Sequence, residues 1–235
     1  MQPPGDVLDL FGIRVIQPLG GRLNQHWLVH GQGEQLVLRR WDKSECDIEF
    51  ELRLLKDIAA MGWPVAPAVG EPVESGGWIW SLFPFLAGSP PSLEDPIAEQ
   101  RARGRLMAEF HVALAQLGDH GQRKGWRRCE AILGDMDLDC VLAEHEHERP
   151  EEVRILRWHL DRSRERIATL TLHSLPGTII HGDFTAWNLR YSGGRLSGIL
   201  DFELAHYDHR VGEFALCVSL IFRADGLHIA RIRQA

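Results

Sequence analysis

The first 84 residues show a pattern of apolar and polar positions that predicts a β-meander with one helix. Apolar runs of strand length, separated by turns rich in glycine and polar residues, lie at residues 13–17, 25–29, 36–41, 69–73 and 78–83. Residues 47–61 instead repeat their apolar side chains every three or four positions, which is typical of a helix with one buried face. Gly62 and Pro64 would end that helix.

The pattern changes after a segment rich in proline and glycine between Pro84 and Pro91, which we interpret as a linker between two lobes. Stretches with helical period follow at residues 94–118, 150–172 and 209–222. Short apolar runs that predict strands lie at residues 178–180, 187–191 and 195–200. This order predicts an α+β chain, with a β-rich N-terminal lobe at residues 1–84 and a mainly helical C-terminal lobe at residues 85–235.

Composition and charge narrow the class of protein. Hydrophobic residues make up 44% of the chain and charged residues 25%, which is ordinary for a globular protein. The net charge of −7 disfavours nucleic-acid binding, which usually needs a basic excess. No apolar run has the length of a membrane span, and no secretory leader is visible, so we expect a cytoplasmic protein. The four cysteines, Cys46, Cys129, Cys140 and Cys217, are scattered and do not have the spacing of zinc ligands. We therefore expect them to be free thiols in a reducing compartment.

The segment with the most chemical content runs from Ile180 to Asn188 and reads Ile-His-Gly-Asp-Phe-Thr-Ala-Trp-Asn. Asp201 follows a predicted hairpin that would fold it back beside Asn188. Phosphoryl transfer needs a carboxylate beside the attacking hydroxyl and oxygen ligands for Mg²⁺, and Asp183, Asn188 and Asp201 could supply these groups. Two other readings stay open, namely that these are ordinary capping and turn residues, or that they belong to a metal-dependent hydrolase.

These motifs carry a resemblance to a known family. His181-x-Asp183-x-x-x-x-Asn188 resembles the protein-kinase catalytic loop, with Gly182 in place of arginine, and Asp201-Phe202-Glu203 stands where kinases have D-F-G. Together they resemble the aminoglycoside phosphotransferase family, which also includes choline-kinase-like enzymes. The resemblance implies a protein-kinase-like two-lobed fold and the transfer of a γ-phosphoryl group from ATP or GTP, with Mg²⁺, to a small-molecule hydroxyl.

Residue roles follow from the same resemblance. Asp183 would be the catalytic base, and Asn188 with Asp201 would hold Mg²⁺. His181 lies in the same catalytic loop, where we expect it to brace the loop rather than to act as the base. The family usually has an aspartate that braces this loop from the following helix, and Glu213 stands at that position here.

The N-terminal lobe supplies a candidate phosphate clamp. Val37-Leu38-Arg39-Arg40 resembles the strand that carries the phosphate-binding lysine of kinases, and Arg39 takes the lysine position. Strand alternation sends Arg39 and Arg40 to opposite faces, so that only one of them can enter the cleft. We expect Glu51 to be the ion-pair partner of Arg39. Surface arginines and a solvated helix glutamate are the alternatives.

Two further segments would contact the nucleotide. Gly20, Gly21 and Asn24 belong to a turn that resembles the nucleotide loop of the family, because glycine lets backbone N–H groups approach phosphate closely. Phe83 and Phe85 lie in the expected hinge, where backbone groups would bond the purine. The glycine turn could also be an ordinary hairpin turn, and the apolar hinge residues could belong to the core.

The C-terminal end departs from the resemblance. Family members continue with further helices that help to wall the acceptor pocket, so we describe the fold as C-terminally short and keep a nucleotide-binding pseudoenzyme as the alternative function. The apolar segment 214–222 would need cover, which predicts a homodimer through it. The acceptor could be an aminoglycoside, a choline-like amine, an amino alcohol or a sugar, and the negative net charge favours a cationic one.

Overall fold

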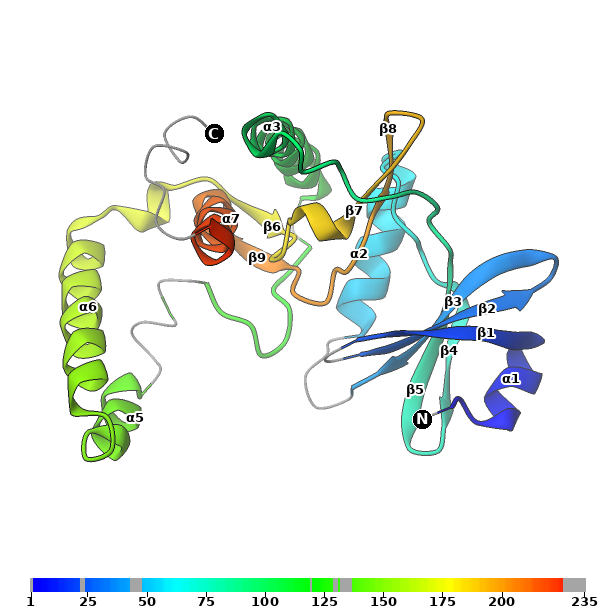
Figure 1. Cartoon of the computed structure of the whole chain (residues 1–235), viewed down its shortest axis with the longest axis horizontal. Helices are drawn as coiled ribbons and strands as arrows, with labels where there is room; N and C mark the ends of the chain where they lie inside the picture. The colour runs from blue at the N-terminus through cyan, green and yellow to red at the C-terminus, as the bar shows by residue number, and fades with distance from the viewer. Residues whose placement is uncertain are drawn as a thin grey trace.

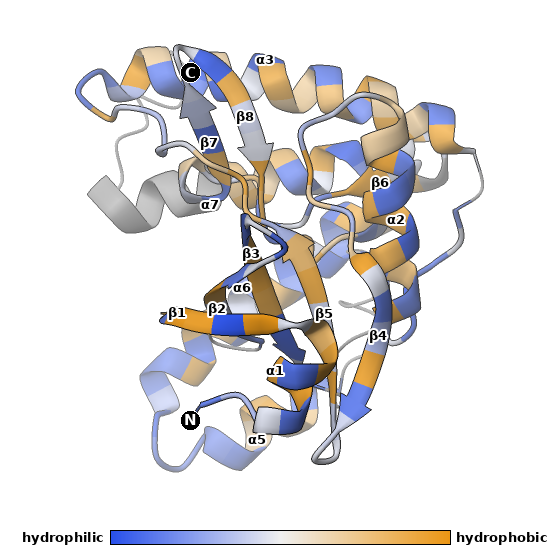
Figure 2. Ribbon diagram, turned by 90° about the vertical axis from the view of Figure 1, so that its right-hand side faces the viewer, coloured by the Kyte–Doolittle hydropathy of each residue, from blue (hydrophilic) through white to orange (hydrophobic). Residues whose placement is uncertain are grey.

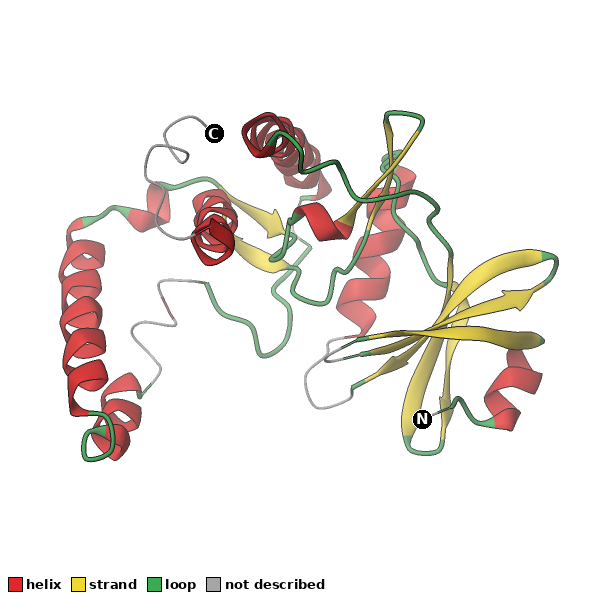
Figure 3. Ribbon diagram, viewed as in Figure 1, coloured by secondary structure: helices red, strands yellow, loops and turns green. Residues whose placement is uncertain are grey.

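The computed structural model describes residues 2–21, 24–42, 48–118, 120–128, 131 and 137–225, and the side chains of residues 173 and 218–225 lie outside this description. The five-stranded sheet lies at one end of the molecule, and most of the helices, with two small strand pairs among them, lie toward the other end (Figure 3). This arrangement confirms the α+β class with a β-sheet N-terminal lobe and a mainly helical C-terminal lobe. The lobe boundary after residue 84 stays a prediction.

The N-terminal lobe is built on one antiparallel sheet with the strand order β1-β2-β3-β5-β4. Its strands are β1 (Ile13–Gly20), β2 (Gln25–Gly31), β3 (Glu34–Trp41), β4 (Val69–Ser75) and β5 (Trp78–Pro84). A short helix, α1 (Gly5–Phe11), packs beside β1 and β4, and α2 (Ile48–Ala60) connects β3 to β4 (Figure 1). The hydropathy colouring in Figure 2 shows that β5, which lies between β3 and β4, is mostly apolar.

Strand alternation in β3 decides which side chains meet α2. Leu36 and Leu38 belong to the cluster under α1, whereas Val37 and Trp41 pack in the cluster that contains α2. Because successive side chains point to opposite faces, Arg39 shares the face of Val37 and Trp41. The strand therefore aims Arg39 toward α2.

The C-terminal lobe surrounds two small β elements with helices. The helices are α3 (Pro96–Leu114), which a 3₁₀ turn at Ala115–Leu117 extends, α5 (Leu138–His145), α6 (Pro150–Thr169) and α7 (Arg210–Asp225). Strand β6 (Gly177–Ile180) pairs with β9 (His206–His209), and β7 (Leu189–Ser192) forms a hairpin with β8 (Arg195–Ile199). In Figure 1 the α5–α6 hairpin stands at the end of the molecule farthest from the sheet.

One apolar core joins the two lobes. Phe50 and Leu54 of α2 share a buried cluster with Phe110 of α3, with Phe184 and with Phe202. The ring of Phe110 lies 4.9, 5.8 and 6.2 Å from the rings of Trp63, Phe184 and Phe202, counted between ring centroids. Burial of these aromatic rings fixes the position of the helical lobe relative to α2.

Some elements differ from the expectation. The sequence pattern did not reveal α1 or α5, and β9 (His-Tyr-Asp-His) was missed because its residues are polar. Residues 187 and 188, expected in a strand, belong to a 3₁₀ turn at Ala186–Asn188. In α6 only Val153 and Leu160 are buried, whereas Leu156 and Leu170 of the expected apolar stripe are exposed.

The cysteines and the segment 214–222 were also subjects of prediction. Cys140 and Cys217 are free thiols, whereas Cys46 and Cys129 lie outside the described residues. Phe214 and Leu216 are exposed, and the side chains beyond Cys217 lie outside the description, so the homodimer stays a prediction.

Within the described residues, no helix is both long enough and apolar enough to cross a membrane.

Candidate active site

A cavity of about 480 Å³ lies between the sheet and the β7–β8 hairpin. The sheet lobe contributes the predicted residues Gly20, Gly21, Asn24, Arg39, Glu51, Phe83 and Phe85 to its lining. The helical lobe contributes Asn188, Asp201 and Glu203. Segments far apart in the sequence therefore line one cavity.

The catalytic loop leaves β6 through a turn that only glycine can make. Gly182 has a φ of +83°, and a Cβ at this position would lie 2.4 Å from the carbonyl oxygen of Leu204. This close approach explains why glycine stands here in place of the kinase arginine. The amide of Asn188 then donates to the backbone oxygen of Asp183 at 2.9 Å and to its carboxylate Oδ2 at 3.0 Å. The loop thus holds the Asp183 side chain against Asn188. Asn188 lines the cavity, whereas Asp183 is not among the lining residues.

His181 is completely buried beneath this loop. Its Nδ1 accepts the backbone N–H of Asp183 at 3.2 Å, and its Nε2 donates to the carbonyl of Leu200 at 2.8 Å. Burial lowers the pKa of His181 below its usual value, so the ring is held neutral. Both ring nitrogens are used within the protein, which makes His181 a brace between the loop and the end of β8.

Glu213 on α7 is a second brace for the loop. Its carboxylate is fully buried and accepts the backbone N–H groups of His181 at 3.1 Å and Gly182 at 2.8 Å. The Nε2 of His111 on α3 lies 2.6 Å from the same carboxylate. A glutamate thus reaches the loop from the position where the family usually has an aspartate. The contribution of His111 was missed, because one histidine beside Phe110 in an apolar stripe is typical of an ordinary core residue.

Asp201 reaches the site through the β7–β8 hairpin. Leu189 pairs with Ile199, and the N–H of Leu200 donates to the carbonyl of Asn188 at 2.8 Å. Asp201 has a φ of +65°, a left-handed conformation that is uncommon outside glycine and concentrates at functional sites. Asp201 is exposed as a whole residue, but partial desolvation of its carboxyl, followed by the nearby carboxylate of Glu203, raises the pKa of Asp201 to about 7. A divalent cation bound beside Asp201 would stabilise the ionised carboxylate and lower this pKa.

The oxygen atoms that face the cavity suit a hard cation. With both N–H groups of its amide used by Asp183, Asn188 can offer only its oxygen to a ligand. In the described part of the chain, no three His, Cys, Asp or Glu side chains form a group that could hold a metal. A cation at Asn188 and Asp201 would therefore need further oxygen ligands from phosphate or water, which is the usual situation of Mg²⁺.

Arg39 lines the cavity, as the resemblance to the kinase strand implied. Its Nη1 lies 2.5 Å from Glu51 Oε1, and both side chains are buried. Arg40 points the other way, with its guanidinium 4.3 Å from the ring centroid of Trp78. The predicted pairing of Arg39 with Glu51 is confirmed, and its role toward phosphate stays a prediction.

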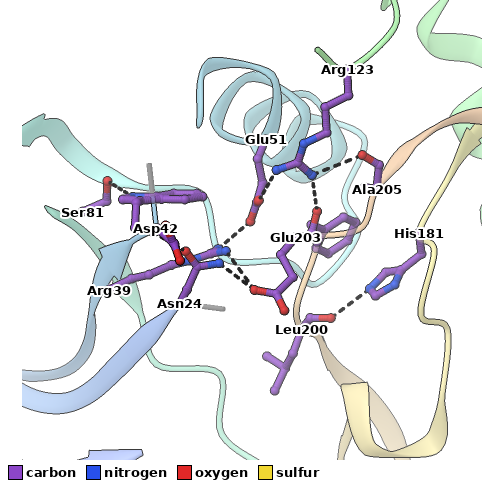
Figure 4. A network of polar contacts seen from close by, with 12 residues as sticks. Asn24, Arg39, Asp42, Glu51, Ser81, Arg123, His181, Leu200, Glu203 and Ala205 are labelled. Carbon is purple, nitrogen blue, oxygen red and sulfur yellow. Dashed lines mark hydrogen bonds and ion pairs between the residues drawn. The ribbon is translucent and has the colours of Figure 1, made fainter. Parts of the chain in front are cut away.

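Arg123 is a buried arginine that sequence reasoning missed. Its Nη2 lies 3.2 Å from Glu51 Oε2, and its Nη1 donates to the carbonyls of Phe202 at 3.0 Å and Ala205 at 3.2 Å (Figure 4). Glu51 therefore lies between two arginines from different parts of the chain. Arg123 follows a polar loop without periodicity, so no sequence signal distinguished it from a solvated arginine.

The glycine turn lies at the edge of the same network. A Cβ on Gly21 would lie 1.7 Å from the carbonyl oxygen of Asn24, so the turn requires glycine. The Asn24 amide donates to Glu203 at 2.6 Å and accepts the N–H of Asp42 at 3.0 Å. His26 also lines the cavity, and burial together with Arg39 lowers its pKa to about 4, so this ring is neutral near pH 7.

The hinge residues have mixed surroundings. Phe83 is buried in the shared core, as the alternative reading allowed, while part of it lines the cavity. Phe85 is 38% exposed, and its N–H donates to the carbonyl of Gln35 at 3.3 Å. Contact with a purine base stays a prediction for both residues.

Comparisons with known proteins agree with this architecture. The chain is 28% identical to the homoserine kinase of Rhizobium etli over 217 residues, which cover 87% of this chain and 64% of that protein. It is also 28% identical to the homoserine kinase of Agrobacterium fabrum over 215 residues, with 87% and 63% covered. The chain thus spans slightly less than two thirds of the length of these relatives.

Solved structures show the same fold. A thermostable mutant of the aminoglycoside phosphotransferase APH(4)-Ia in its apo form superposes with a TM-score of 0.62 at 16% identity, covering 97% of this chain and 79% of that one. A mutant of the same protein in ternary complex with ADP and hygromycin B gives a TM-score of 0.59 at 15% identity, covering 89% and 74%. Residues 14–235 match the model of the phosphotransferase enzyme family. With this match over most of its length, the kinase-like fold, and Asn188 of one motif beside Asp201 of the other in one cavity, the chain belongs to the phosphotransferase enzyme family.

Proposed function

We propose that this chain transfers the γ-phosphoryl group of a nucleoside triphosphate, ATP or GTP, to the hydroxyl of a small molecule in the presence of Mg²⁺. The observation that carries the proposal is the convergence of two sets of groups on one cavity. The buried Arg39–Glu51 pair comes from the sheet lobe, and Asn188 with Asp201 comes from the helical lobe. Phosphoryl transfer relies on positioning and charge stabilisation, which these groups can provide.

The sheet lobe would hold the nucleotide. Arg39 presents a planar guanidinium to the phosphates, and Glu51 fixes its orientation. The turn at Gly20 and Gly21 would bring backbone N–H groups close to phosphate oxygens. Phe83 and Phe85 would flank the base near the hinge. A structure of the same fold in ternary complex with ADP supports nucleotide binding by this chain.

The catalytic loop would hold the acceptor. Asp183 is oriented by Asn188 and would accept the hydrogen bond of the acceptor hydroxyl as it attacks. His181 and Glu213 keep the loop in this conformation. Mg²⁺ held by Asn188 and Asp201 would neutralise charge on the phosphates.

The acceptor we propose is an amino alcohol, with homoserine as the first candidate. The named activity of the relatives supports this choice. Aminoglycosides and choline are the next candidates, because hygromycin B occupies a structure with the same fold. A net charge of −7 favours an acceptor that carries an amine.

The test is nucleoside-diphosphate release with ATP or GTP, Mg²⁺ and a panel containing homoserine, choline and hygromycin B. We expect Asp183→Ala to bind nucleotide normally and to lose at least about a hundred-fold in transfer, as typical for a group acting on the reacting hydroxyl. Asp201→Ala should lose Mg²⁺-dependent nucleotide binding. Asp9→Asn on α1, exposed and outside the cavity, is the matched control.

Three outcomes would contradict the proposal. Full transfer by Asp183→Ala would remove the proposed mechanism. Nucleotide binding without transfer to any acceptor would favour the pseudoenzyme. Phosphate release that no acceptor increases would indicate a hydrolase.

A further inference from the structure

Glu203 occupies an unexpected position in the cavity. It is the third residue of the Asp-Phe-Glu motif, where protein kinases have glycine, so its side chain has no counterpart there. That side chain is 15% exposed and lines the cavity. Its Oε2 accepts a hydrogen bond from Asn24 Nδ2 at 2.6 Å and lies 3.7 Å from Arg39 Nη2 (Figure 4). One carboxylate thus links the turn after β8 to two residues of the sheet lobe.

Both partners of Glu203 lie on the side of the cavity where the proposed function puts the nucleotide. Arg39 is the residue assigned to phosphate, and Asn24 belongs to the glycine turn with Gly20 and Gly21. The Asp42 N–H holds the Asn24 oxygen, which turns the amide N–H₂ toward Glu203. Arg39 Nη1 is committed to Glu51, whereas its buried Nη2 has no hydrogen-bond partner in the described part of the chain. The Glu203 carboxylate therefore attracts Nη2 electrostatically, but at 3.7 Å it lies too far away to accept a hydrogen bond from it.

Carboxylates already surround Arg39 without a ligand. Glu51 pairs with Arg39 and Arg123, Glu203 lies beside Arg39, and the Asp201 carboxyl also interacts with Arg39 through charge. A polyphosphate entering this site would place further negative charge beside Glu203. Because like charges at short range in a partly desolvated site repel each other, Glu203 and the phosphates would compete for Arg39.

We propose that Glu203 is a latch between the lobes, which occupies the phosphate subsite of the ligand-free cavity and is displaced when a polyphosphate binds. The inference rests on the proposed function, because it takes the Arg39 site as the place of the nucleotide phosphates. The displaced carboxylate gives up Asn24 and Arg39, and the phosphate oxygens replace it on both. Binding therefore exchanges one anion for another, and the affinity for a metal-free polyphosphate is lower than Arg39 and Asn24 alone would provide.

The test is Glu203→Gln, which keeps the size of the side chain and removes its charge. Calorimetric titration with inorganic tripolyphosphate, and separately with ADP in EDTA, should show binding tighter than wild type by about ten-fold, as expected for one like charge removed beside the anion. Glu151→Gln removes the same charge from α6, where the side chain is 74% exposed, and should leave both affinities unchanged. A gain in affinity cannot result from misfolding.

Other titration results would contradict the proposal that Glu203 acts as a latch. Equal or weaker tripolyphosphate binding by a folded Glu203→Gln protein would overturn the latch, and a loss confined to Mg²⁺–ADP would identify Glu203 as a metal ligand instead. If that variant does not fold, Glu203→Asp withdraws the carboxylate from Asn24 by one methylene, and unchanged affinity would then overturn the latch. Absence of tripolyphosphate binding in both wild type and variants would do the same.

The titrations also separate the two proposals. A wild-type chain that binds tripolyphosphate but no nucleotide would contradict the proposed function and leave the latch standing. Phosphoryl transfer by wild type, together with weakened tripolyphosphate binding by Glu203→Gln, would leave the function standing and overturn the latch.

Discussion

At the scale of single residues, two backbone positions shape the loop after β6 and the turn after β8. Gly182 and Asp201 both have positive φ. A left-handed conformation costs a non-glycine residue free energy, which the surrounding packing must supply. Glycine avoids this cost at residue 182, whereas aspartate bears it at residue 201 and keeps its carboxylate in the cavity.

Gly182→Ala should therefore disrupt the loop. The new Cβ would lie 2.4 Å from the Leu204 carbonyl, and the φ of +83° would be strained as well. We expect thermal unfolding to show a loss of about 1–3 kcal/mol in stability, with a large loss of transfer activity. Gly33→Ala is the matched control, because its φ is +85° with no atom within 4 Å of the new Cβ. Equal effects in both variants would show that strain alone, and not the close contact with Leu204, matters.

Asp201→Asn should stabilise the metal-free protein in a pH-dependent way. The folded pKa of Asp201 is raised from 3.8 to about 7, so the folded state holds this proton more tightly than the unfolded state. Stability from the wild-type carboxyl is thus present below about pH 4 and is lost as the pH rises to about 7. In EDTA the variant should have the higher Tm at pH 8, with a difference that shrinks toward pH 4. A difference independent of pH would refute this reasoning.

At the scale of elements, buried charges connect segments that no strand or helix joins. Arg123 ties α2 to the turn that carries Phe202 and Ala205, and Glu213 ties α7 to the catalytic loop. A buried charge is costly unless paired, and removal of one partner leaves the other uncompensated. The contacts of Arg123 therefore make the position of α2 depend on the turn after β8, which follows Asp201.

Arg123→Met should expose this dependence. Glu51 would lose one of its two partners and two carbonyls would lose their donor, so we expect a loss of about 3–5 kcal/mol in stability by denaturant unfolding. Arg154→Met on α6 removes an ion pair whose side chains are 70% and 74% exposed, and should cost less than about 1 kcal/mol. Comparable losses in the two variants would argue against a structural role for the buried arginine.

At the scale of the whole molecule, the continuous core makes the two lobes interdependent. Phe110 of α3 packs against Trp63, which follows α2, and against Phe184 and Phe202 beside the cavity. Loss of this ring would loosen both lobes at once. The cavity between them thus depends on packing at some distance from the proposed chemistry.

Phe110→Ala should lower the stability of the entire chain. A fully buried phenylalanine costs about 3–5 kcal/mol when truncated to alanine, and the wild-type chain should unfold in one calorimetric transition because its core is shared. Trp158 is 59% exposed, so Trp158→Ala should change stability by less than about 1 kcal/mol. Two separate transitions in the wild type would contradict the shared core.

The sequence alone determined the groups whose positions follow from local geometry. Asp183 and Asn188 share one loop, and the hairpin returns Asp201 to Asn188. Strand alternation allowed only one of Arg39 and Arg40 to enter the cleft, and the resemblance to the kinase strand indicated Arg39. Strand and helix periods are regular, so they specify the face on which each of these side chains lies. The α+β order of elements could be predicted for the same reason, while polar β9 could not.

Only the tertiary structure decided which distant groups meet. Arg123 bonds Glu51 across 72 residues, His111 meets Glu213 across 102, and Asn24 meets Glu203 across 179. Periodicity states that a side chain is buried or faces a cleft, but the partner it finds there depends on how whole elements pack against one another. The motifs were therefore visible in the sequence, whereas the buried network that braces them and the carboxylate that occupies the proposed phosphate site required the folded chain.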